Sequence, residues 1–190
     1  RVYPPAPERG SSAMRLMTTH GYLADMDNEG KYWLYSNRWP GWNRSMGRIG
    51  PYGQLLSFDD KTLYGVQVFT EFVRVRRGRH LGGKGQRLFA REHGQKKDRW
   101  SAFVKMRVRA MTVAGDKMIV AGTPDLVPPD DPMAAIEGRM GAKLLVMSTK
   151  NGAKVAESNL DVVPAFDGMI AAEGGLYVSM QDGKIVRIGK

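Results

Sequence analysis

Short apolar runs separated by turn residues dominate the last quarter of the chain. Residues 143–149, KLLVMST, form an apolar run that ends at the turn signal Lys150-Asn151-Gly152, and residues 154–160 continue in rough alternation. Alternation around an Asn-Gly turn is typical of a β-hairpin. Three more short strands, each bounded by a turn, are expected at 169–172, 176–180 and 185–188. This region lacks the 3.6-residue apolar stripe of an amphipathic helix.

The strand pattern repeats along the chain. When residues 108–122 are set over 165–180, Met111 aligns with Met169, an offset of 169 − 111 = 58 residues. A fainter copy lies upstream, in LLSFDDKTLYGVQVF at 55–69. Repetition at a fixed interval indicates a repeat architecture, so we expect about three copies of one antiparallel β unit.

These units predict an all-β fold of about three four-stranded antiparallel blades of a β-propeller. Blades usually span about 40 to 50 residues, and long connecting loops would account for the longer interval. Closed propellers need about four blades or more, so we expect these blades to be part of a larger propeller. We assign the blades to 31–190, and 1–30 to an N-terminal segment of a preceding blade with a strand at 13–18.

Two long excursions interrupt the strand pattern. Residues 123–141 are rich in proline and contain an acidic cluster, which leaves room for at most a short helix at 133–137. Residues 74–99 are a basic loop with ten Lys or Arg against Glu92 and Asp98. This loop therefore holds 10 − 2 = +8 of the chain's net charge of +10.

Composition excludes several classes of protein. The chain has 190 residues, 42% of them hydrophobic and 25% charged, as in an ordinary globular domain. It has no cysteine, which excludes disulfides and thiolate chemistry. No run of about 18 apolar residues is present, so no membrane span is expected.

The last 48 residues, KLLVMSTKNGAKVAESNLDVVPAFDGMIAAEGGLYVSMQDGKIVRIGK, resemble the closing blades of a known family. This family comprises the pyrroloquinoline-quinone-like β-propeller repeat proteins of planctomycete type, which are similar to quinoprotein dehydrogenases. The segments YWLYSNRWPGW at 32–42 and VRAMTVAGDKMIVAGTPD at 108–125 resemble further parts of the same region. The resemblance implies a propeller in a larger secreted protein, periplasmic or extracellular. Pyrroloquinoline quinone (PQQ) and calcium are implied only for its catalytic relatives.

The basic loop is the candidate contact surface. Clustered cations bind polyanions by releasing counterions, and the nearby aromatic residues Phe72, Phe89 and Trp100 could stack on bases. Docking on an acidic protein is the alternative. The residues assigned to this partner- or polyanion-binding surface are Arg74, Arg76, Arg77, Arg79, Lys84, Arg87, Lys96, Lys97 and Arg99.

The stretch GRHLGGKG at 78–85 has the frame of a phosphate-binding loop. Such a loop needs a following Ser or Thr for magnesium, where this chain has Gly85, and it must open a helix. We therefore interpret the stretch as a glycine-rich turn.

Other candidate sites also have simpler interpretations. Asp25, Asp27 and Glu29 are spaced like calcium ligands, but Ser36 replaces the twelfth-position Glu, which favours a β-turn. The aromatic cluster between Tyr32 and Trp42 is expected to pack between blades. The histidines lack metal-binding spacing, so no metal site is expected. The available acids, Asp59, Asp60, Asp161 and Asp167, lie in expected turns.

Together these features predict a non-catalytic propeller scaffold or binding module within a larger secreted assembly. Its basic loop would contact an acidic partner or a polyanion, and the rest of the propeller or another chain would be its partner. No cofactor is expected. Two alternatives stay open, part of a quinone-dependent dehydrogenase and a nucleic-acid-binding protein.

Overall fold

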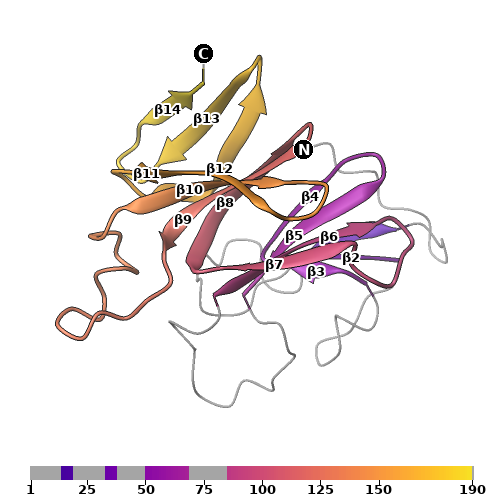
Figure 1. The fold of residues 1–190 in the computed structure, drawn as a ribbon, viewed down its shortest axis with the longest axis horizontal. Helices are drawn as coiled ribbons and strands as arrows, with labels where there is room; N and C mark the ends of the chain where they lie inside the picture. Colours follow the sequence, from indigo (N-terminus) through magenta and orange to yellow (C-terminus); the bar gives the residue numbers. More distant parts are fainter. Residues whose placement is uncertain (1–13, 19–32, 38–49, 69–84, 190) are drawn as a thin grey trace.

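The computed structural model describes residues 14–18, 33–37, 50–68 and 85–189, and every regular element in them is a β-strand (Figure 1). The strands are β1 (Arg15–Thr18), β2 (Trp33–Ser36), β3 (Tyr52–Gly53), β4 (Leu55–Phe58), β5 (Thr62–Gln67), β6 (Gln86–Glu92), β7 (Trp100–Val104), β8 (Met106–Ala114), β9 (Lys117–Pro124), β10 (Ala142–Ser148), β11 (Lys154–Leu160), β12 (Pro164–Ala172), β13 (Gly175–Met180) and β14 (Ile185–Ile188). The all-β prediction is confirmed.

The strands form four antiparallel sheets in which each strand pairs with the next one along the chain. Sheet A contains β1–β3, sheet B β4–β7, sheet C β8–β11 and sheet D β12–β14. Such an up-and-down meander is the topology of a propeller blade. The blade-like architecture is therefore confirmed, with four sheets in the described residues, and these sheets do not close into a ring.

The 58-residue repeat extends to the pairing of individual residues. Met111 of β8 pairs with Val120 of β9, and 58 residues later Met169 of β12 pairs with Val178 of β13. The predicted hairpin of the last quarter is also present, as β10 and β11. Equal spacing of apolar residues thus produces equal register, because a one-residue slip would turn every side chain to the opposite face.

The sheets stack face to face in chain order. Between sheets B and C, side chains such as Tyr64 and Leu88 pack against Met118 and Val120 in the largest apolar cluster. Between sheets C and D, Ile119 and its neighbours pack against β13. Because neighbouring residues of a strand face opposite sides, β9 supplies both interfaces from alternate positions.

Sheet A covers the other face of sheet B. Leu56, Leu63 and Phe89 of sheet B pack against Trp33 and Tyr35 of sheet A. The first strands of successive sheets also lie side by side, β4 beside β8 and β8 beside β12. Sheets B, C and D therefore fan out from their first strands (Figure 1), as blades do around a propeller axis.

A buried tryptophan ties sheet B to sheet C. The Trp100 indole Nε1 donates a hydrogen bond of 2.7 Å to the Thr149 carbonyl, in the turn between β10 and β11. The Thr149 N–H in turn donates to the Asp116 carbonyl at 2.9 Å. Gly152 closes the same turn with φ +73°, and a Cβ on it would lie 2.5 Å from Trp100 Cε3.

The basic segment 74–99 is not a loop throughout, and that prediction is wrong for part of its second half. Gln86–Glu92 forms β6, an inner strand between β5 and β7. Leu88 and Ala90 fill the interface with sheet C, while Phe89 fills the interface with sheet A. Burial of these three side chains outweighs the low strand preference of a charged sequence.

The proline-rich excursion is present but starts later than predicted. Strand β9 continues to Pro124, and the irregular segment runs from Asp125 to Gly141. Residues 132–140 form consecutive turns and no helix, and their backbone hydrogen bonds include one from Glu137 N to the Met133 carbonyl at 2.9 Å. The predicted strand at 13–18 is confirmed as β1.

Replacing Gly152 with alanine should destabilise the protein by about 2 to 3 kcal/mol, because the variant combines a left-handed backbone with a collision against Trp100. Gly174→Ala is the matched control. Gly174 has φ +72°, but its added Cβ would meet no atom within 4 Å, so about 1 kcal/mol is expected. Urea unfolding measures both values, and equal losses would show that the contact with Trp100 contributes nothing.

Candidate functional site

The structure describes four of the nine residues predicted to form the contact surface. Arg87, Lys96, Lys97 and Arg99 lie on β6 and on the connection from β6 to β7. The others, Arg74, Arg76, Arg77, Arg79 and Lys84, lie outside the described residues.

The four described cations are not all at the same place. Lys96 and Lys97 lie in the turn that follows β6, whereas Gly85 marks the start of that strand. A seven-residue strand is about 20 Å long. The backbone of Arg87, near the start of β6, is therefore separated by most of a strand length from the turn with Lys96 and Lys97.

The side chain of Arg87 is part of a half-buried network of ion pairs and hydrogen bonds. Its guanidinium forms an ion pair with Asp98 and donates to Gln67 Oε1 at 2.8 Å, and Asp98 also accepts from Arg91 Nε at 2.6 Å. Both guanidinium groups lie over the ring of Phe89, at 5.3 Å and 5.9 Å from its centroid. These contacts make Arg87 a structural residue of the interface between sheets A and B.

The network extends to sheet A. Gln67 Nε2 donates to the Tyr52 carbonyl at 2.9 Å. Burial raises the pKa of the Tyr52 hydroxyl, and the positive charges of Arg87 and Arg91 offset part of that rise. Tyr52 therefore stays protonated at neutral pH.

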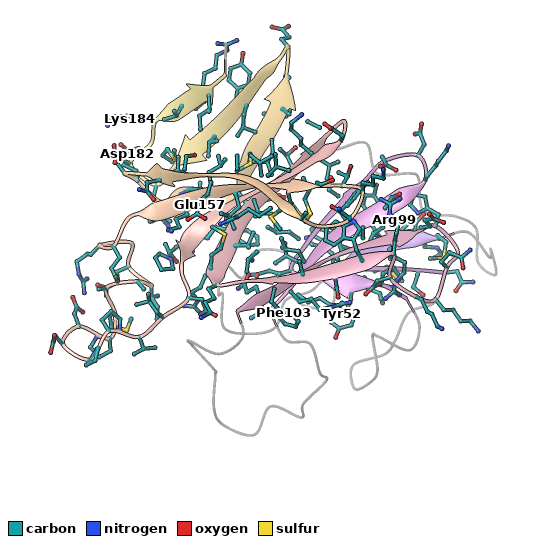
Figure 2. All side chains as sticks on the ribbon, in the orientation of Figure 1. Tyr52, Arg99, Phe103, Glu157, Asp182 and Lys184 are labelled. Carbon is teal, nitrogen blue, oxygen red and sulfur yellow. The ribbon has the colours of Figure 1, made fainter. Side chains whose placement is uncertain are left out.

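Arg99 also has structural partners. Its Nη2 donates to the Thr149 carbonyl at 2.8 Å, so this oxygen accepts from both Arg99 and Trp100. Its Nη1 lies 3.8 Å from Glu92 Oε1. Arg99 thus stabilises the contact between sheets B and C at the end of β7 (Figure 2).

Lys96 and Lys97 are the predicted site residues best placed for a partner. Both side chains are exposed in the β6–β7 turn. That turn adjoins the β4–β5 turn, because the His93 N–H donates to the Lys61 carbonyl at 2.8 Å. Lys61 is also exposed. Three lysines therefore occur on two adjoining turns at one end of sheet B.

Aromatic rings lie beside these turns. The ring of Tyr35 is 5.2 Å from Phe58 and 5.9 Å from His93, measured between centroids. Phe58 and His93 are partly exposed, whereas Trp33 and Tyr35 also pack on sheet B. The predicted packing role is confirmed for Trp33 and Tyr35, and Tyr32, Trp39 and Trp42 lie outside the described residues.

Asp59 lies in the β4–β5 turn, as predicted, and its carboxylate accepts hydrogen bonds that stabilise the turn. Partial burial alone would raise its pKa, but hydrogen bonds from Lys61 N (2.9 Å), Thr62 N (2.6 Å) and the Tyr64 hydroxyl (3.0 Å) lower it on balance. The carboxylate therefore stays ionised and closes the turn. Asp60 and Asp161 lie in exposed connections, and Asp167 adopts φ +55° at a bulge in β12.

Another charged group lies on sheet C. Glu157 accepts from Lys143 Nζ at 2.5 Å and from Lys154 Nζ at 2.7 Å, and these two hydrogen bonds lower its pKa from 4.5 to about 2. The three side chains are exposed on β10 and on the edge strand β11. They pair across the strands and show no arrangement for proton transfer at neutral pH.

Metal binding finds no support in the part of the chain that the structure describes. No three His, Asp or Glu side chains gather there in a group that could hold a metal ion. Asp25, Asp27 and Glu29 lie outside the described residues, and Ser36 is buried in β2. In the same described ranges, no helix is long and apolar enough to cross a membrane.

The glycine-rich stretch at 78–85 is described only at Gly85, where it is followed by a strand. Gly85 has φ +85°, and a Cβ on it would overlap the Val104 carbonyl oxygen. A phosphate loop needs a helix N-terminus at this point, and β6 takes its place. The structure at Gly85 therefore gives no support to a phosphate loop, and glycine there allows the close approach to the Val104 carbonyl.

The sequence did not reveal the partners of the arginines. In the sequence, Asp98 follows Lys96 and Lys97 as one of two acids in the basic segment. In the structure, its carboxylate bridges Arg87 and Arg91 across the β6–β7 hairpin. The sequence signal that could have indicated this network is the alternation Arg87, Phe89, Arg91, because it places all three side chains on one face of a strand.

Comparisons with known proteins add little. No protein-family model matches the chain, and no curated protein matches it. A solved structure described as the "Crystal structure of the computationally designed Ika4 protein" is similar with a TM-score of 0.45 and 8% identity. The match covers 70% of this chain and 63% of that protein, so the chain spans less than two thirds of its length.

Replacing Asp98 with asparagine should destabilise the protein by about 2 kcal/mol, because two half-buried guanidinium groups lose their shared carboxylate. Asp116→Asn is the control, since Asp116 pairs with Lys117 on an exposed turn and its loss should leave the unfolding midpoint unchanged. Thermal and urea unfolding measure the difference. An unchanged midpoint for Asp98→Asn would contradict a structural role for Arg87.

Proposed function

We propose that the chain is a non-catalytic β-propeller-type scaffold that works within a larger assembly. The observation that carries this proposal is the stacking of four meandering sheets through interleaved apolar faces. Two acids of the described residues have structural partners. Asp59 closes a turn, and Asp98 bridges Arg87 and Arg91.

Membership of the pyrroloquinoline-quinone-like repeat proteins, and a place in the periplasm or outside the cell, are part of this proposal. The closing-blade sequence at 143–190 supports it, together with the blade topology of sheets B, C and D. A scaffold of this kind needs no quinone.

Its contact with an acidic partner or polyanion is assigned to the lysines of the β6–β7 turn. Lys96 and Lys97 are exposed, whereas Arg87 and Arg99 have partners within the protein. Exposed lysines keep their charge available to an anion.

The mass of the native particle tests the scaffold proposal. Purification from the native source without denaturant should give a particle much larger than the chain's 21.1 kDa, because a scaffold stays bound to its partners. Sedimentation velocity measures the mass. A particle near the mass of one chain would overturn the proposal.

Retention on immobilised heparin tests whether the lysines of the β6–β7 turn bind a polyanion. The double variant Lys96→Ser, Lys97→Ser should elute at lower salt than the unmodified protein, because fewer counterions are released on binding. The control Lys105→Ser, Lys150→Ser removes the same charge from exposed positions elsewhere. Equal shifts for the two variants would show that net charge, and not the turn, determines retention.

A further inference from the structure

The outer face of sheet D has no neighbouring sheet in the described residues. The inner face, with Leu176, Val178 and Met180, packs on sheet C. The opposite face presents Ile170 and Ile185, with exposed fractions of 60% and 71%. A sheet face in water normally carries polar side chains, so two exposed isoleucines there require an explanation.

The residue pairing shows that this face occupies a stacking position. Ala121 pairs with Leu144 in sheet C, and both side chains lie against sheet D. The equivalent pair in sheet D is Ser179 with Ile185, because Ser179 follows Ala121 by 58 residues. The outer face of sheet D therefore repeats the surface that sheet D covers on sheet C.

The composition of the face differs from that of a sheet core. Tyr177 takes the place of Ile119 and pairs with Ile170 and Arg187. The Arg187 guanidinium lies 6.0 Å from the centre of the Tyr177 ring. Aromatic and arginine side chains among aliphatic ones are typical of the centre of an interface between proteins.

The other end of the stack offers no matching exposed surface among the described residues. Leu34 and Ser36 lie on the side of β2 that faces away from sheet B, and both have an exposed fraction of 0%. A second copy therefore cannot add its sheet D to that side without first uncovering it. Among the sheets that the structure describes, the apolar face that stays exposed for a second copy is the outer face of sheet D.

We propose that two copies of the chain associate through the outer faces of their D sheets. This surface comprises Ile170, Tyr177, Ser179, Ile185 and Arg187. The same patch on both copies makes the contact isologous, so association stops at a dimer. Arg187 of one copy can stack on Tyr177 of the second copy, as guanidinium groups do on aromatic faces.

The contact continues the face-to-face stacking already present between sheets C and D. A three-stranded face is smaller than a standard interface of about 800 Å² per partner, so we expect a reversible dimer. The proposal rests on the proposed scaffold function and names one surface through which the assembly forms.

Sedimentation of the recombinant chain over a range of concentrations tests the proposal. A reversible dimer is expected, and the double variant Ile170→Lys, Ile185→Lys should weaken association about tenfold or more, because it places four charges in the contact. Val155→Lys is the control, since Val155 is 60% exposed on β11 of sheet C and should leave the dimer intact. Circular dichroism checks that each variant is folded.

Cross-linking provides a second readout that does not depend on the lysine variants. The chain has no cysteine, so Ile185→Cys and the control Val155→Cys each introduce one thiol. A short bis-maleimide should join two copies through Cys at position 185 and not through Cys at position 155. A chain that stays monomeric, or a dimer that the double variant Ile170→Lys, Ile185→Lys leaves unchanged, would overturn the proposal.

The two proposals fail separately. If the recombinant chain is monomeric but the native particle is heavy, a different chain covers sheet D and only the dimer proposal fails. If the recombinant chain forms the dimer but the native particle has the mass of one chain, the scaffold proposal fails instead.

Discussion

Sheet C packs between two other sheets, and the rest of the structure depends on this arrangement. It requires apolar side chains at successive positions of β9 and β10, because alternate residues face sheets B and D. A polar group at these positions would be buried without water. The polar contacts of the described residues therefore occur mainly at strand ends, in turns and at the rims of the sheets. Asp59, Asp98 and Thr149 all lie in such places.

The basic character of the chain has two physical origins that composition alone does not separate. Arginine is suited to half-buried positions, because its planar guanidinium pairs with a carboxylate and stacks on a ring at the same time. Arg87 and Arg91 do both, with Asp98 and Phe89. Lysine in the β6–β7 turn keeps its charge in water. The arginines of β6 thus contribute to the fold, and the lysines contribute to the surface.

The sequence was sufficient for features set by local pattern. The hairpin of β10 and β11 followed from alternation around Lys150-Asn151-Gly152. The recurrence of a strand pair in β12 and β13 followed from the 58-residue repeat. Strand β6 was missed because its charges hide the apolar positions Leu88 and Ala90. Lys96 and Lys97 were correctly placed in a basic stretch, but the partners of Arg87 and Arg99 were not predictable, since they come from across the hairpin and from sheet C.

The linear order of the stack also governs how the protein loses structure. Each sheet packs only on its neighbours, so stability is close to a sum of terms for single sheets and adjacent pairs. Sheet D has one such neighbour in the described residues, whereas sheets B and C have two each. Its amide protons should therefore exchange with solvent through a local opening that leaves the B–C interface closed. The protein would then behave as a rigid centre with a separately opening end.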